Sequence, residues 1–197
     1  MIKKIKKGNK RTILIFVSSF FILFICLIIL FVLYRKVTYI PTNQELTARF
    51  QEHKSEFILL RDMILEEEEL LSVGSDNVGD FWFDRGEWTT HKPPYKNYSK
   101  QEMLEAVGLS EERYNEYLNL LDKVGAYRVS KQDTQSSNKE VYFGIYRSGI
   151  VPSGRTKGVV YSPIGRKEDS STCESELSSG VCFLRIEDEW YIEEEWN

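Results

Sequence analysis

The chain has few of the residues that usually build catalytic and metal sites. Its 197 residues include two histidines and three cysteines, and neither an H-x-x-x-H nor a C-x-x-C spacing occurs. Metal sites that depend on these spacings are therefore not expected. The G-x-S-x-G motif of many serine hydrolases is also missing. The sequence predicts no cofactor and no metal.

Acidic residues are missing from the first 36 residues, which hold eight of the 26 basic residues and none of the 30 acidic ones. The rest of the chain then carries 18 basic and 30 acidic residues, a net charge of −12. Nucleic-acid binding needs a cationic face, so no nucleic-acid partner is expected for this acidic part.

Residues 13–33 form one apolar run without a charge, ILIFVSSFFILFICLIILFVL. A helix of this length spans ~30 Å, the thickness of a bilayer's hydrocarbon core. We therefore expect a transmembrane helix over residues 12–34 that contacts membrane lipid. Basic residues precede the run at Lys3, Lys4, Lys6, Lys7, Lys10 and Arg11, and only Arg35 and Lys36 follow it. This asymmetry predicts that residues 1–11 stay in the cytoplasm and that the remainder is exported.

A cleaved signal peptide is the main alternative. Its apolar core has ~7–15 residues and ends in small residues, whereas this run is longer and the first alanine of the chain is Ala48. Lipoprotein processing at Cys26 is disfavoured because Ile25 precedes it. An uncleaved, single-pass anchor is the simplest interpretation, with the C-terminal domain periplasmic or extracellular.

Residues 35–41 read as a linker, and residues 42–197 as one exported domain. Capping boxes at Thr42–Glu45 and Ser99–Glu102 predict helix starts, and Ser110 predicts a third. From Ala126 onward the apolar period changes to that of strands, which are expected at 126–130, 140–147, 157–162, 181–187 and 189–196. The predicted fold class is α+β, with about three helices followed by an antiparallel sheet of four to five strands.

Two further motifs have competing interpretations. Cys173 and Cys182 fit a disulfide in an oxidising compartment, and two free thiols are the alternative. Residues 149–156, GIVPSGRT, approach a phosphate-binding P-loop, but Arg155 replaces its lysine and the next residues are typical of a strand. A glycine-rich hairpin is the preferred interpretation, and no nucleotide partner is expected.

Weak catalytic candidates remain. His53 lies on the apolar stripe of the first helix, where a histidine–carboxylate pair could act as a general base, although a packing role is the simpler interpretation. Asp80, Asp84 and Glu87 stand among aromatic residues, as the paired carboxylates of glycan hydrolases do. The alternative is a sheet edge with its aromatic residues packed inward. The runs Glu66–Glu69 and Glu193–Glu195 read as solvated faces.

The spacing of Phe50, His53, Glu56–Phe57, Leu60 and Met63 resembles the opening helix of a family of uncharacterised bacterial envelope proteins, many of them lipoproteins. Further points of resemblance to this family are Leu109–Glu111, Lys157–Tyr161 and Trp190–Tyr191. The resemblance would cover most of residues 42–197, and it implies location and fold but no activity.

The predicted function is a membrane-anchored, non-enzymatic interaction or binding role in the bacterial envelope, with another envelope or secreted protein as partner. The alternative is an envelope hydrolase that acts on glycan through carboxylate catalysis.

Overall fold

The computed structural model describes residues 21, 24–26, 39–90, 92–93, 96–133, 139–150, 153–166 and 180–196. The chain divides into two units, Met1–Ile40 and Pro41–Asn197. In the first unit the described residues 21 and 24–26 are helical, and their side chains are exposed. The predicted segments 1–11 and 12–34 lie mostly outside the described residues. Within the residues that are described, no helix combines the length and the apolarity needed to cross a membrane.

The second unit begins with two helices, α2 (Asn43–Glu52) and α3 (Lys54–Glu66). The predicted capping box starts α2, because the Thr42 hydroxyl accepts from the Glu45 amide and Glu45 bonds back to the Thr42 amide. One continuous helix was expected here, but His53 interrupts it with a backbone at φ −115° and ψ 29°. The apolar stripe nevertheless continues across the bend, since Phe50 and Phe57 are both fully buried.

Two more helices follow, α4 (Lys100–Ala106) and α5 (Glu111–Val124). Ser99 and Glu102 form the second predicted capping box, and Ser110 caps α5 by accepting from the Arg113 amide. Gly125 ends α5 in the left-handed conformation, where glycine carries no Cβ penalty.

The strands form one sheet that is antiparallel throughout. Their order is β4-β3-β2-β1-β5-β6-β7-β9-β8, and β4 and β8 are the two edges. The nine strands are β1 (Ser72–Gly74), β2 (Asn77–Val78), β3 (Phe81–Asp84), β4 (Glu87–Thr90), β5 (Arg128–Asp133), β6 (Lys139–Ile150), β7 (Ser153–Tyr161), β8 (Gly180–Glu187) and β9 (Trp190–Trp196).

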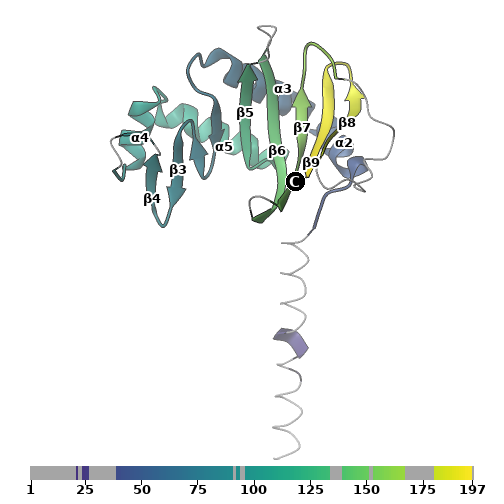
Figure 1. Ribbon diagram of the computed structural model, residues 1–197, viewed down its shortest axis with the longest axis horizontal. Helices are drawn as coiled ribbons and strands as arrows, with labels where there is room; N and C mark the ends of the chain where they lie inside the picture. The colour runs from purple at the N-terminus through teal and green to yellow at the C-terminus, as the bar shows by residue number, and fades with distance from the viewer. Residues whose placement is uncertain are drawn as a thin grey trace, which may run out of the picture. The chain divides into compact units, whose positions relative to one another are not determined.

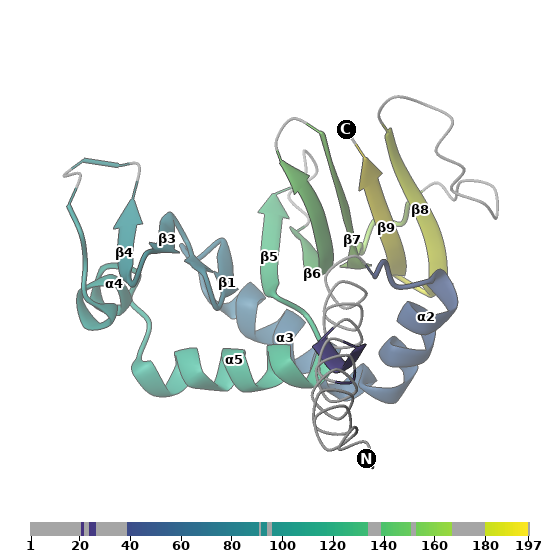
Figure 2. The same ribbon diagram turned by 90° about the horizontal axis from the view of Figure 1, so that it is seen from below.

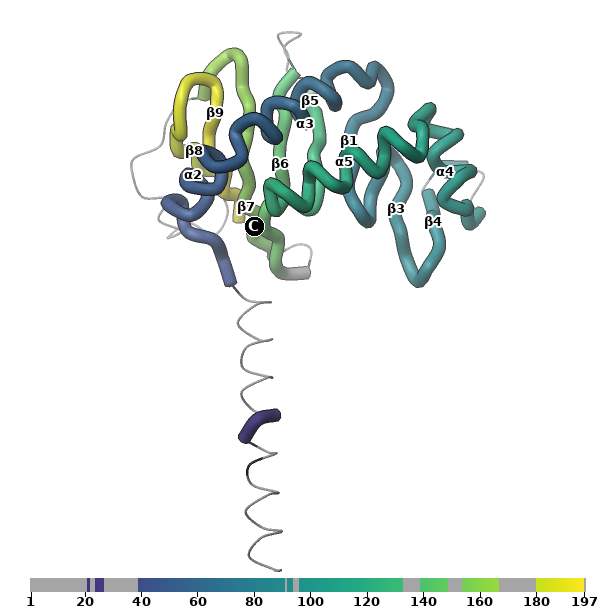
Figure 3. The backbone as a smooth tube through the Cα atoms, turned by 180° about the vertical axis from the view of Figure 1, so that it is seen from behind, coloured from purple at the N-terminus to yellow at the C-terminus, as the bar shows by residue number. Residues whose placement is uncertain are grey.

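Helices α2, α3 and α5 lie across one face of this sheet, as Figures 1 and 3 show from opposite sides and Figure 2 shows from below. The core forms between the two layers. At its centre the rings of Phe50 and Phe57 from the helices meet those of Phe143 on β6 and Trp190 on β9. The ring centroids are 4.9 Å apart for Phe50–Trp190, 5.1 Å for Phe57–Phe143 and 5.8 Å for Phe143–Trp190.

The α+β class and the antiparallel sheet are confirmed, and the five predicted strands correspond to β5–β9. The predicted count of four to five strands is wrong, because nine are present in the described part of the chain. The predicted order of helices before strands also fails, since β1–β4 lie between α3 and α5. These strands have two to four residues each, too few to show an alternating pattern.

The predicted disulfide stays a prediction. Cys182 on β8 is buried, while Cys173 lies outside the described residues.

Replacement of Phe57 by alanine should destabilise the globular unit by ~3–5 kcal/mol, because a fully buried ring at the junction of helix and sheet is lost. Urea unfolding measures this change. Leu59→Ala on the same helix is the control, since Leu59 is 44 % exposed and should cost less than about 1 kcal/mol. Equal losses would contradict the described core.

Candidate functional site

The β3–β4 hairpin presents aromatic side chains at one end of the sheet. Its turn consists of Arg85 and Gly86, both with positive φ, as two-residue turns that match strand twist require. Trp82 and Phe83 on β3 are 39 % and 47 % exposed. Because consecutive side chains of a strand point to opposite faces of the sheet, Trp82 and Phe83 are exposed on opposite faces of the hairpin.

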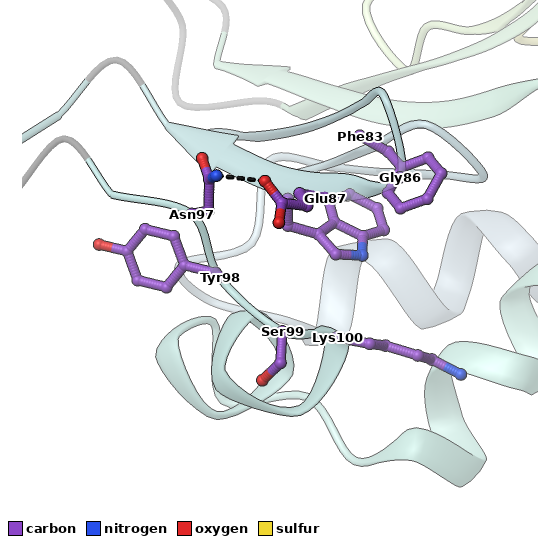
Figure 4. Close-up of a pocket in the computed structure, with 8 residues that line it drawn as sticks. Phe83, Gly86, Glu87, Asn97, Tyr98, Ser99 and Lys100 are labelled. Carbon is purple, nitrogen blue, oxygen red and sulfur yellow. Dashed lines mark hydrogen bonds between the residues drawn. The ribbon is translucent and has the colours of Figure 1, made fainter.

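A cleft of about 350 Å³ lies beside this hairpin. Its lining comes from the hairpin and from the segment that leads into α4: Phe83, Gly86, Glu87, Trp88, Asn97, Tyr98, Ser99 and Lys100. Figure 4 shows that Asn97 and Glu87 point toward each other, where the Asn97 amide donates to the Glu87 carboxylate. The cleft therefore combines aromatic walls with a polar pair.

The wall opposite the hairpin is held in place by a single backbone bridge. The Tyr98 amide donates to the Trp88 carbonyl at 2.8 Å, and the Trp88 amide donates back at 3.3 Å. Tyr98 packs edge-on against Phe81 with ring centroids 5.0 Å apart, and Phe83 packs on Trp88 at 5.3 Å. These contacts join the two walls of the cleft.

A second cleft, of about 560 Å³, adjoins the first and shares Lys100 with it. It lies between α4 and the start of α5, and its apolar lining is Leu104 and Leu109. The Lys100 ammonium bonds Glu111 at 2.8 Å. The surface open to a partner thus extends from the hairpin turn to the start of α5.

The three predicted carboxylates do not converge. Asp80 pairs with Lys92, and Asp84 lies 3.8 Å from Arg85. Only Glu87 lines the cleft. Glycosidic hydrolysis needs two carboxyl groups that flank one bond, and the cleft lining supplies one.

His53 lies in another part of the unit, at the bend between α2 and α3, where its backbone carbonyl accepts from the amides of Glu56 and Phe57. Its side chain is half-buried. The pKa of Glu56 is lowered by the Ser55 hydroxyl first, and His53 makes a smaller contribution in the same direction. His53 and the hairpin carboxylates therefore do not form one site.

The described P-loop-like residues, 149–150 and 153–156, belong to the paired strands β6 and β7, with Ile150 paired to Ser153. A strand follows the glycines, so the helix N-terminus that would bind phosphate is missing at this position. The preferred interpretation, a glycine-rich hairpin, is confirmed. Among the described residues, no three histidine, cysteine or acidic side chains gather as metal ligands would.

The prediction that Glu193–Glu195 form a solvated face is wrong for Glu194, which is 3 % exposed. Its carboxylate bonds Lys157 at 3.3 Å and also pairs with Arg155. Lys157 is equally buried, at 4 % exposure. Burial of two opposite charges requires this pairing. The sequence does contain a sign of the pair, the alternating basic residues Arg155 and Lys157, but it can be recognised only once β7 and β9 are known to be neighbours.

Residues 97–100 were also missed as a wall of the cleft. They join β4 through one bridge, which leaves no periodic pattern in the sequence.

Comparison of the chain with protein-family models, curated proteins and solved structures finds no match. The resemblance to envelope proteins therefore stays a prediction.

The change Glu194→Gln should lower the free energy of unfolding by ~3–5 kcal/mol, because the buried Lys157 ammonium loses its counter-charge. Glu195→Gln, on the next residue of β9, is the matched control and should cost less than about 1 kcal/mol. Urea unfolding at neutral pH compares them. Similar losses for both variants would show that the buried pair is not what matters.

Proposed function

We propose that this protein is a single-pass, membrane-anchored binding protein of the extracytoplasmic space. Its recognition surface is the β3–β4 hairpin with the adjoining cleft. The observation that carries the proposal is the exposed aromatic side chain of Phe83 in the lining of a cleft that also contains Tyr98 and the hydrogen-bonded pair Glu87 and Asn97.

The kind of partner follows from the composition of this surface. Aromatic side chains are enriched at the centres of protein interfaces, and polar groups form their rims. Here Phe83 and Trp88 supply the apolar part, and Asn97, Glu87 and Lys100 surround it. Another envelope or secreted protein fits such a mixed surface.

The location rests on the sequence. The charge-free run of residues 13–33 is long enough to span a bilayer, and the basic residues in front of it favour a cytoplasmic N-terminus. The acidic character of the remainder suits a domain that stays dissolved beside the membrane.

Glycan hydrolysis is the second candidate, and one observation favours it: Glu87 and Asn97 lie beside aromatic rings, as in sites that hold sugars. We rank it second because the cleft lining has a single carboxylate, Glu87, where glycan hydrolysis uses two. Release of soluble fragments from purified peptidoglycan, lost in Glu87→Gln, would establish this activity instead of simple binding.

Topology gives the first test. A reporter enzyme that is active only outside the cytoplasm should be active when fused after Asn197 and inactive when fused after Arg11. Exchanging the basic residues before the apolar run for those after it should reduce the activity of the C-terminal fusion. Activity of a cytosol-specific reporter at the C-terminus would overturn the proposed location.

Partner capture gives the second test. A photo-crosslinking amino acid at position 83 of the full-length protein should give discrete adducts in intact cells, identified by mass spectrometry. The change Tyr98→Ala, in the lining of the same cleft, should reduce them at least about tenfold, a typical loss for an interface anchor. A crosslinker at Leu71, which is also exposed but lies outside the cleft, is the control. Equal adducts from both positions would refute the hairpin as the recognition surface.

A further inference from the structure

The two clefts beside the β3–β4 hairpin form one continuous surface, because Lys100 lines both of them. The first cleft lies at the hairpin, and the second is lined by residues of α4 and by Leu109–Glu111 at the start of α5. In Figure 4 the Lys100 side chain points away from Glu87 and Asn97. A partner segment that enters the first cleft can continue over the second, since the two adjoin.

The lining of this surface carries more negative than positive charge. Its charged side chains are three carboxylates, Glu87, Glu105 and Glu111, and one ammonium group, Lys100. Lys100 bonds Glu111 at 2.8 Å, so these two charges offset each other. The lining therefore supplies no counter-charge for Glu87 and Glu105.

Neutral amides are the hydrogen-bond partners of these two carboxylates. The Asn97 amide donates to Glu87, and the Gln101 amide donates to Glu105 at 2.9 Å. Among the residues that the structure describes, neither Glu87 nor Glu105 forms an ion pair. An amide orients a carboxylate but does not neutralise it, so both negative charges remain open to a cation.

Basic side chains next to the first cleft are already paired with other carboxylates. Lys96 bonds Glu102 at 3.2 Å, and its ammonium also lies 4.6 Å from the centroid of the Tyr98 ring. Arg85 in the hairpin turn lies 3.8 Å from Asp84. A cation from a partner can therefore bond Glu87 without displacing a cation of the chain itself.

Apolar groups accompany the two carboxylates. The Phe83 ring in the first cleft is 47 % exposed, and Leu104 and Leu109 form the nearly buried base of the second. Arginine is enriched at protein interfaces, and its planar guanidinium donates two parallel hydrogen bonds to a carboxylate. Its aliphatic stem also covers apolar surface. An arginine side chain therefore matches both components of this surface.

We propose that a basic, arginine-containing segment of the partner protein binds across the two clefts, with its guanidinium groups on Glu87 and Glu105. The inference rests on the proposed function, because it names the chemistry of the partner that the hairpin surface recognises. The net charge of −12 on residues 37–197 acts in the same direction at longer range. Such a charge attracts a basic segment and speeds its association.

Selection from a random dodecapeptide library displayed on phage tests this chemistry, with the full-length protein in detergent micelles as bait. The retained peptides should be enriched in arginine beside leucine or aromatic residues. Replacing these arginines by citrulline, an uncharged isostere, should weaken binding of the synthetic peptide about tenfold or more, because charge-assisted hydrogen bonds are lost. Enrichment of peptides without basic residues, or no enrichment at all, would overturn the proposal.

Variants of the two carboxylates assign the binding to this surface. Glu87→Gln and Glu105→Gln should each weaken the arginine peptide about tenfold, and glutamine keeps an oxygen that can accept the amide hydrogen bond. Glu52→Gln removes an exposed carboxylate from α2 and, as the matched control, should leave the affinity unchanged. Equal urea midpoints for all three variants verify that the fold is intact. Equal affinities for all three would refute the assignment.

The same variants distinguish this inference from the proposed function. Crosslinked adducts from position 83 in intact cells should fall in Glu87→Gln and in Glu105→Gln, and they should persist in Glu52→Gln. Adducts that are unchanged in all three variants would keep the hairpin as a binding surface and exclude a basic partner. The absence of adducts in the wild type would remove both.

Discussion

The structure depends on the contact between two phenylalanines of the first helices and two aromatic residues of the sheet. Phe50 and Phe57 are 0 % exposed, and they pack on Phe143 and Trp190 with centroid distances of 4.9 Å for Phe50–Trp190 and 5.1 Å for Phe57–Phe143. Each ring buries a large apolar area, and tilted or edge-on ring pairs add to the stabilisation. This contact joins the two layers and fixes where the helices cross the sheet. The far end of the sheet, with β3 and β4, projects beyond it and is free to present its side chains.

That projection explains why the two polar regions of the unit differ in character. At the β3–β4 end, Asp80 and Asp84 pair with exposed lysine and arginine side chains, which contribute little stability. On strands β6 and β9, Glu140 and Glu194 are buried and pair with Arg166, Arg155 and Lys157. A surface of the first kind can exchange water for a partner at low cost. Charges of the second kind stay with their counter-charges, because their separation in a buried setting is costly.

Local signals in the sequence predicted most of the elements, whereas contacts between distant residues could not be predicted from the sequence. The capping boxes at Thr42 and Ser99 and the cap at Ser110 are complete within a few residues, and all three formed as expected. Strands β5–β9 have enough residues to show alternation. In contrast, β1 and β2 are too short for a pattern, and the bend at His53 divides a helix whose apolar stripe is continuous in the sequence. The wall of the cleft at Asn97 and Tyr98 was missed because it depends on one bridge to Trp88. Of the predicted site residues, only Glu87 lies in the cleft, since side-chain convergence is set by neighbouring strands and not by sequence distance.

The order β7-β9-β8 places the last strand of the chain between two earlier ones. Trp190 at the start of β9 is also the residue on which Phe50, near the beginning of the unit, packs. Native pairing at this end therefore waits until the final residues are available, and contacts so distant in sequence form slowly. The same topology makes β9 a poor place for truncation, because its loss would separate β8 from β7 and remove Trp190 from the core.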